Sequence, residues 1–128
     1  MTHTRIAIVT DNVPAPRSAF SVAMKAGQLV FVSGQLGIDL ESGRPPADVR
    51  MEAELAIGYI RRALEAAGLG LEHVIKTTVY VTDFADYAAL NEVYAREFPQ
   101  PFPARATVQV ARLLAGARVE IEAVAAVP

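Results

Sequence analysis

The chain has 128 residues, of which 52% are apolar and 20% charged, and its net charge is −2. This composition predicts one globular domain over residues 1–128, and the lack of cysteine excludes disulfides, thiolate zinc sites and a cysteine nucleophile. Lysine and arginine are scattered and no apolar run approaches the ~20 residues that span a bilayer, so we expect a cytoplasmic protein with neither a nucleic-acid nor a membrane partner.

Three short β-type segments open the chain, at residues 5–10, 20–25 and 28–33. Pro14 and Pro16 predict a loop between the first two. Ala26-Gly27 joins the second and third, and a two-residue connection that contains a glycine is typical of a β-hairpin. Glycines and prolines between residues 34 and 46 then predict a long loop.

Helical periodicity begins after Asp48, which is a suitable N-cap, and an amphipathic helix is expected over residues 49–67. Gly68 ends this helix because glycine accepts the positive φ of a helix C-terminus. A second helix is expected from the cap Asp83 to about Phe98, before three prolines that forbid its continuation.

Three further strands are expected, at residues 74–82, 104–111 and 117–125. The first of them alternates, with Ile75, Thr77, Val79 and Val81 on one face. The whole order predicts an α+β fold in which two helices cover one face of a sheet of about six strands. The other face carries polar and aromatic groups as well as apolar ones, which favours packing against a second copy over full exposure to solvent.

Few residues have the pattern of a known catalytic or metal site. His3 lies near the terminus and His73 between a helix and a strand, and we assign both surface or structural roles. Two histidines without cysteine provide no metal-ligand spacing, and neither a P-loop, a dinucleotide fingerprint nor a nucleophile elbow is present.

Arg105 and Glu120 are the main candidates for chemistry. Arg105 shares a strand face with Thr107 and Gln109 and has little local acid to pair with, so both a rim salt bridge and capture of a carboxylate or phosphate fit it. Glu120 shares a face with Glu122, and could be a general base, a partner of Arg105 or a solvated residue. Asn91 lies beside the apolar stripe of its helix, where its amide needs a partner.

Several segments together resemble one family. They are residues 28–37 (QLVFVSGQLG), 74–82 (VIKTTVYVT), 91–95 (NEVYA), 103–113 (PARATVQVARL) and 119–125 (VEIEAVA). In order and spacing these are similar to the RidA/YjgF reactive-intermediate deaminase family, also labelled endoribonuclease L-PSP, and the resemblance covers residues 13–125.

The resemblance implies a chorismate-mutase-like fold that assembles as a homotrimer with clefts between subunits. It implies hydrolysis of enamine and imine acids such as 2-aminoacrylate to ammonia and a 2-oxo acid, with no metal or organic cofactor. Carried over by position, Arg105 would bind the substrate carboxylate and Glu120, near Arg105, would position or activate the attacking water. The cleft would be lined by Phe20, Ser33, Gly34, Asn91, Ala106 and Thr107.

One segment departs from the family pattern. Many members of the deaminase branch have a tyrosine in a Gly-Pro-Tyr-Ser context, where this chain reads Ser18-Ala-Phe-Ser21. Phe20 keeps the ring and loses a hydroxyl, and one neutral hydrogen bond contributes about 0.5–1.5 kcal/mol. Two alternatives therefore stay open beside the deaminase: a non-catalytic trimer that binds small carboxylates as a sensor or partner protein, and a ribonuclease, against which the acidic composition argues.

Overall fold

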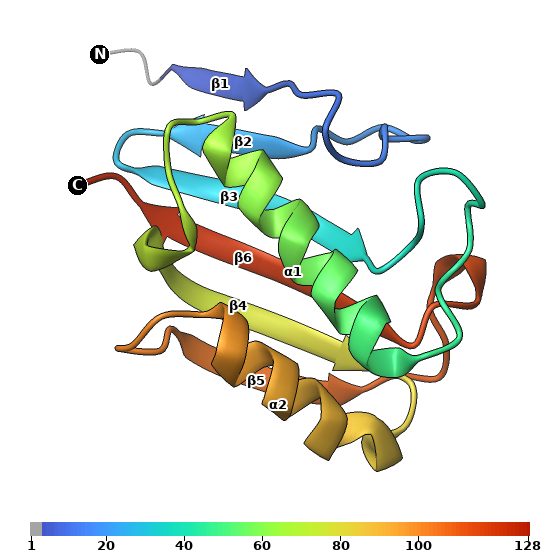
Figure 1. Cartoon of the computed structure of the whole chain (residues 1–128). Coiled ribbons are helices and arrows are strands. Elements are labelled where there is room, and N and C mark those ends of the chain that lie inside the picture. The colour runs from blue at the N-terminus through green and yellow to red at the C-terminus, as the bar shows by residue number, and fades with distance from the viewer. Residues whose placement is uncertain (1–3) are drawn as a thin grey trace.

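The computed structural model describes residues 4–128, and within them six strands form one mixed sheet (Figure 1). The strands are β1 (Arg5–Ile8), β2 (Ala23–Ala26), β3 (Leu29–Leu36), β4 (Val74–Val81), β5 (Ala104–Gln109) and β6 (Val119–Ala126). Their spatial order is β1-β2-β3-β6-β4-β5, and neighbours are antiparallel except β4 and β5, which are parallel.

Helices α1 (Val49–Glu65) and α2 (Tyr87–Glu97) lie side by side on one face of this sheet (Figure 1). The predicted α+β fold is therefore confirmed. We call the sheet face under the helices the helix face, and the opposite one the open face. Three short 3-10 segments, η1 (Leu71–His73), η2 (Phe84–Asp86) and η3 (Leu114–Gly116), complete the chain order.

The predicted helix signals are present in the structure. Asp48 caps α1 by accepting a hydrogen bond from the Arg50 backbone N–H at 2.8 Å. Gly68, just after α1, has a φ of +76°, as expected for a residue that ends a helix. Asp83 also caps, but it accepts from the Ala85 N–H of η2, which leads into α2.

The core lies between the helices and the helix face. Its largest fully buried apolar side chains are Tyr59, Phe98, Ile57, Ile60, Leu64, Leu90, Ile121, Val30, Val79, Val81 and Val93. Strand β6, at the centre of the sheet, alternates between buried Val119, Ile121 and Ala123 and the half-buried Glu120 and Glu122. The two glutamates therefore project from the open face, as their spacing predicts.

Two strand predictions are wrong in detail. Ile75 is not on the buried face of β4 but is 49% exposed, and Val74 is buried instead, because the β4–β6 register shifts between Val74 and Lys76. Such an irregularity reverses which side chains face the core. Strand β3 continues to Leu36, through the segment in which Gly34 predicts a loop.

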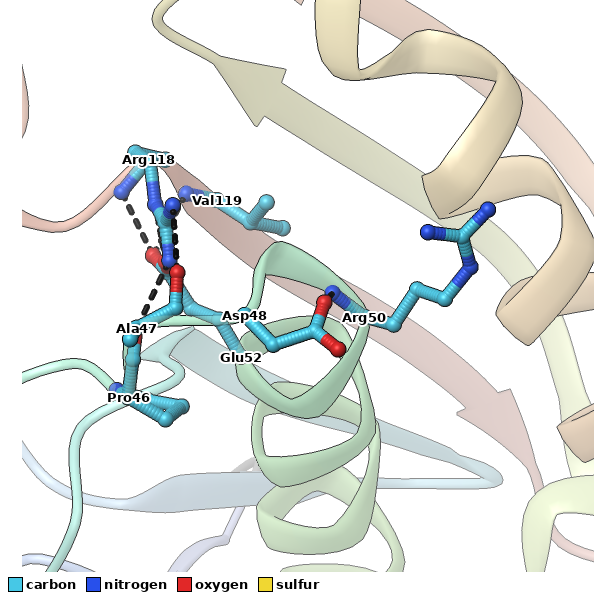
Figure 2. A network of polar contacts seen from close by, with 7 residues as sticks. All are labelled: Pro46, Ala47, Asp48, Arg50, Glu52, Arg118 and Val119. Carbon is cyan, nitrogen blue, oxygen red and sulfur yellow. Dashed lines mark hydrogen bonds and ion pairs between the residues drawn. The ribbon is translucent and has the colours of Figure 1, made fainter.

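A buried carboxylate joins α1 to the start of β6 (Figure 2). Glu52 is fully buried, and it accepts hydrogen bonds from Arg118 Nε at 2.7 Å, from the Val119 N–H at 3.1 Å and from the Arg118 N–H. The Arg118 guanidinium also donates to the backbone carbonyls of Pro46 and Ala47. Gly37 allows the close approach, since a Cβ there would lie 2.0 Å from the Glu52 carbonyl oxygen.

His73 has the structural role expected of it, because its Nδ1 accepts a hydrogen bond from the Gly70 N–H at 2.9 Å. His3 lies outside the described residues. None of the helices in residues 4–128 combines the length and the apolar character needed to cross a membrane.

Candidate active site

Arg105 is held on the helix face by α2. Its neighbour in register on the adjacent strand β4 is Thr77, which faces the core, so the Arg105 side chain points toward α2 and not toward the open face. There the Arg105 Nη2 donates to Asn91 Oδ1 at 2.8 Å and to Tyr87 Oη at 3.2 Å. The guanidinium also lies over the Tyr94 ring, 4.7 Å from its centroid. We call these four residues the Arg105 cluster.

Within the Arg105 cluster, the Tyr94 ring is held in place by a strand of the sheet. Tyr94 is 4% exposed, and its hydroxyl is hydrogen-bonded to the buried Thr77 Oγ1 at 2.6 Å. The ring that supports the guanidinium is therefore fixed to the strand next to β5. A cation over an aromatic face and two hydrogen bonds leave little freedom for Arg105.

No carboxylate neutralises this arginine within residues 4–128. The ion pairs of the described chain involve Arg50, Arg61, His73, Arg96 and Arg118, and Arg105 is in none of them. Both of its short polar contacts use Nη2, which leaves the N–H groups of Nη1 and Nε without a partner among the described residues. The rim salt bridge is therefore excluded within the described chain, and a guanidinium with open donors is suited to bind an anion.

Two other predicted site residues, Ala106 and Thr107, follow Arg105 on β5 and face opposite ways. Ala106 pairs with Thr78 and is exposed on the open face. Thr107 faces the helices, and its Oγ1 is buried without a hydrogen-bond partner among residues 4–128. Because a buried unpaired hydroxyl is unfavourable, Thr107 has a donor available for a ligand or a second chain.

Glu120 forms a separate group on the open face. Its neighbours in register are Leu36 on β3 and Tyr80 on β4. The β3–β6 pairing is irregular between Val32 and Gln35, and this irregularity places Gly34 directly against the glutamate. A Cβ at Gly34 would lie 2.9 Å from the Glu120 carboxyl carbon and Oε2, so an alanine there would displace the carboxylate.

The two glutamates of β6 differ in their partners. Glu122 accepts a hydrogen bond from Tyr80 Oη at 2.8 Å, whereas no residue among 4–128 donates to the Glu120 carboxylate. Burial, and then the charge of Glu122, raise the pKa of Glu120 above its usual range. Glu120 is therefore the carboxylate that is available to accept a proton, and Glu122 is the one occupied by a structural contact.

Ser33 and Phe20 lie at the border of this group. Ser33 Oγ donates to the Ser21 carbonyl oxygen at 2.6 Å, which connects β3 to the segment before β2. Phe20, next to Ser21, is 53% exposed. Beside them the open face has a hollow of about 520 Å³. Its lining is Ser21, Met24, Phe31, Val32, Ser33, Lys76, Thr78, Glu122, Ala123 and Val124.

The expectation that Glu120 lies near Arg105 is wrong for a single chain. Strand β4 separates β5 from β6, and the two side chains leave the sheet on opposite faces. Accordingly, Arg105 is not among the groups that shift the pKa of Glu120. One chain therefore carries two separate groups, which we call half-sites: an arginine half at β5 and α2, and a carboxylate half at β3 and β6.

Tyr87 and Tyr94 are the site residues that sequence reasoning missed. Both lie with Leu90 and Phe98 on one stripe of the helical segment, a spacing that is typical of residues packed in the core. Tyr94 is indeed buried, but Tyr87 is 39% exposed and both rings contact Arg105. The available signal was the hydroxyl that each adds to a stripe position.

Residues 10–127 match the family model described as Endoribonuclease L-PSP. A curated 2-iminobutanoate/2-iminopropanoate deaminase of Escherichia coli K12 is 37% identical over 121 residues, which cover 92% of this chain and 94% of that protein. The crystal structure of RidA from Psychrobacter sp. PAMC 21119 has 42% identity and a TM-score of 0.91, covering 95% of this chain and 99% of that one. Escherichia coli TdcF with bound serine has 36% identity and a TM-score of 0.91, covering 96% and 99%.

Proposed function

This chain belongs to the endoribonuclease L-PSP family, that of the RidA/YjgF proteins, and from this membership and the geometry of the two half-sites we propose that it hydrolyses small 2-imino acids. The reaction converts a 2-imino acid, or its enamine tautomer such as 2-aminoacrylate, to a 2-oxo acid and ammonia. The observation that carries the proposal is the Arg105 guanidinium, fixed by Asn91 and Tyr94 and paired with no carboxylate within residues 4–128.

The substrate class follows from this guanidinium. A guanidinium donates charge-assisted hydrogen bonds to carboxylates, and the open N–H groups of Nη1 and Nε are free to make them. The bound serine of TdcF is a small molecule that also carries a carboxylate. An acid of three or four carbons places its C2 atom one bond from the carboxylate, so that Arg105 fixes the position of the reacting carbon.

In the proposed chemistry Glu120 acts as the general base. It accepts a proton from water as the water oxygen forms a bond to C2 and the C=N bond becomes single. Glu120 passes this proton to the nitrogen, which gives a neutral carbinolamine. It then takes the hydroxyl proton and passes it to the nitrogen as the C–N bond breaks, so that ammonia leaves with both protons of the water and the hydroxyl oxygen becomes the C=O group of the product. An imine is already electrophilic, so positioning and one proton acceptor are sufficient and no metal is required.

We place the complete site between subunits of a homotrimer. Arg105 and Glu120 lie on opposite faces of one sheet, so that a cleft containing both takes them from two chains. The open face also exposes large apolar side chains, with Phe31 47% and Val108 41% exposed. Contact between copies would remove this apolar surface from water.

Light scattering of the purified protein at micromolar concentration tests this assembly. We expect a particle of three chain masses, because a closed ring of identical contacts buries the open face of every subunit. A monomeric particle that still hydrolyses imines would contradict the placement of the site between chains.

Arg105→Ala tests the carboxylate-binding role. A hydrogen bond to a charged group contributes about 1.5–3 kcal/mol, so this change should weaken the binding of pyruvate roughly 10- to 150-fold in calorimetry. Arg96→Ala is the matched control, since Arg96 forms an exposed pair with Glu54 and should leave the affinity unchanged. If wild type and Arg105→Ala bind pyruvate with equal affinity, Arg105 does not bind the carboxylate and its role is structural.

A further inference from the structure

Tyr87 occupies a position that packing alone does not explain. It is the first residue of α2, and it is 39% exposed while Leu90, Tyr94 and Phe98 of the same stripe are 0–4% exposed. The ring is nevertheless held in place. It meets the Phe84 ring edge-on, with centroids 5.8 Å apart, and the Arg105 guanidinium lies 5.7 Å from its centroid.

The direction of the hydrogen bond to Arg105 decides what the Tyr87 hydroxyl can do. A guanidinium only donates, so the Tyr87 oxygen accepts from Nη2 at 3.2 Å and its own O–H remains free to donate. No acceptor among residues 4–128 receives that proton. The nearby Asn91 amide and the Arg105 charge lower the pKa of Tyr87, and a more acidic phenol is a stronger hydrogen-bond donor.

We propose that Tyr87 is a specificity-determining residue, whose hydroxyl donates a hydrogen bond to the substrate carboxylate bound by Arg105. This inference rests on the proposed function. A carboxylate oxygen on the open N–H groups of Arg105 lies next to the phenol, because the phenol is itself in contact with Nη2 of the same guanidinium. Arg105 then supplies the positive charge, and Tyr87 supplies one more hydrogen-bond donor. A neutral carboxamide has an NH2 group in place of one carboxylate oxygen, and this group cannot accept from these donors.

Tyr87→Phe isolates the hydroxyl, since it keeps the ring beside Arg105 and against Phe84. Because a hydrogen bond to a charged group contributes about 1.5–3 kcal/mol, we expect the Kd for pyruvate to rise roughly 10- to 150-fold. The bond is present in both the bound substrate and the transition state, so KM for 2-iminopropanoate should rise by the same factor and kcat should stay within a few-fold. Tyr59→Phe is the control, because the hydroxyl of Tyr59 in α1 donates to the Ile38 carbonyl oxygen and does not contact Arg105. The loss of this hydroxyl should not change the affinity for pyruvate.

A spectroscopic titration separates a direct contact from a structural effect. With pyruvate present, the carboxylate beside the phenol should raise the pKa of one tyrosine in the near-ultraviolet absorbance titration of wild type, and this change should be missing from Tyr87→Phe. If wild type binds pyruvate and Tyr87→Phe binds it with equal affinity, the role of Tyr87 is overturned and the proposed function is not affected. Wild type that does not bind pyruvate overturns the proposed function and this inference with it.

Discussion

Glu120→Gln is expected to lower kcat for 2-iminopropanoate by about 10²–10⁴-fold, which is the usual contribution of a general base. Glutamine keeps the size of the side chain and a carbonyl oxygen but does not accept a proton from water. Binding of pyruvate should stay within a few-fold of wild type, because in the proposed site Arg105 binds the carboxylate and Glu120 does not. Steady-state kinetics together with calorimetry measure the two effects separately.

Glu122→Gln is the matched control for this experiment. Glu122 lies two residues along the same strand face, but its carboxylate is occupied by Tyr80. We expect its kcat at neutral pH to stay within a few-fold of wild type. A Glu120→Gln enzyme that is as fast as Glu122→Gln would show that the water is activated elsewhere and that Glu120 is structural.

The pH dependence of kcat follows from the neighbouring carboxylates of Glu120 and Glu122. Burial and the charge of Glu122 raise the pKa of Glu120, and the base is active only when it is ionised. Activity should therefore rise with pH through a pKa above the ordinary glutamate range, and be lost as pH falls below it. Removing the neighbouring charge in Glu122→Gln lowers the pKa of Glu120, so the acid limb of the profile should move to lower pH.

Glu52→Ala is expected to lower the free energy of unfolding by about 3–5 kcal/mol, as for other buried ion pairs that lose one partner. The change removes the acceptor for Arg118 Nε and for the Arg118 and Val119 backbone N–H groups, all at the start of the central strand β6. Urea denaturation at a fixed protein concentration measures the loss.

Glu54→Ala provides the comparison. Glu54 is two residues further along α1 and forms an ion pair with Arg96 in which both side chains are about half exposed. Exposed pairs contribute about 0–1 kcal/mol, so this variant should be nearly as stable as wild type. Equal stability of the two variants would contradict the account of Glu52 as the link between α1 and β6.

Local signals predict most of this fold because each acts over a few residues. The caps at Asp48 and Asp83, the glycine at position 68 and the alternation of β6 each depend on the chain within one or two turns. Ile75 is different. Its exposure depends on a register shift between β4 and β6, which pairs segments about 50 residues apart, and no local pattern shows it.

The buried Glu52 could not be identified by the same reasoning. A glutamate beside an apolar stripe ordinarily lies in solvent, and its burial depends on Arg118, which is 66 residues away in the chain. The fold brings the two together only because β6 enters the middle of the sheet beneath α1.

The candidate residues of the site could be predicted from the sequence, but not their arrangement. Alternation shows which residues share a face of β5 and which share a face of β6. It does not show that β4 lies between these strands, or that β5 turns Arg105 toward the helices while its Ala104, Ala106 and Val108 face outward. The separation of Arg105 from Glu120 follows from those two facts.

Hydrolysis of freshly generated 2-aminoacrylate by wild-type protein tests the central claim most directly. We expect ammonia and pyruvate to be released in equal amounts, much faster than in buffer alone, and the rate at low substrate concentration to be roughly 10- to 150-fold lower in Arg105→Ala. If wild type binds pyruvate but accelerates neither this reaction nor that of any related imine, the claim of catalysis is contradicted. The protein would then be a carboxylate-binding protein without turnover.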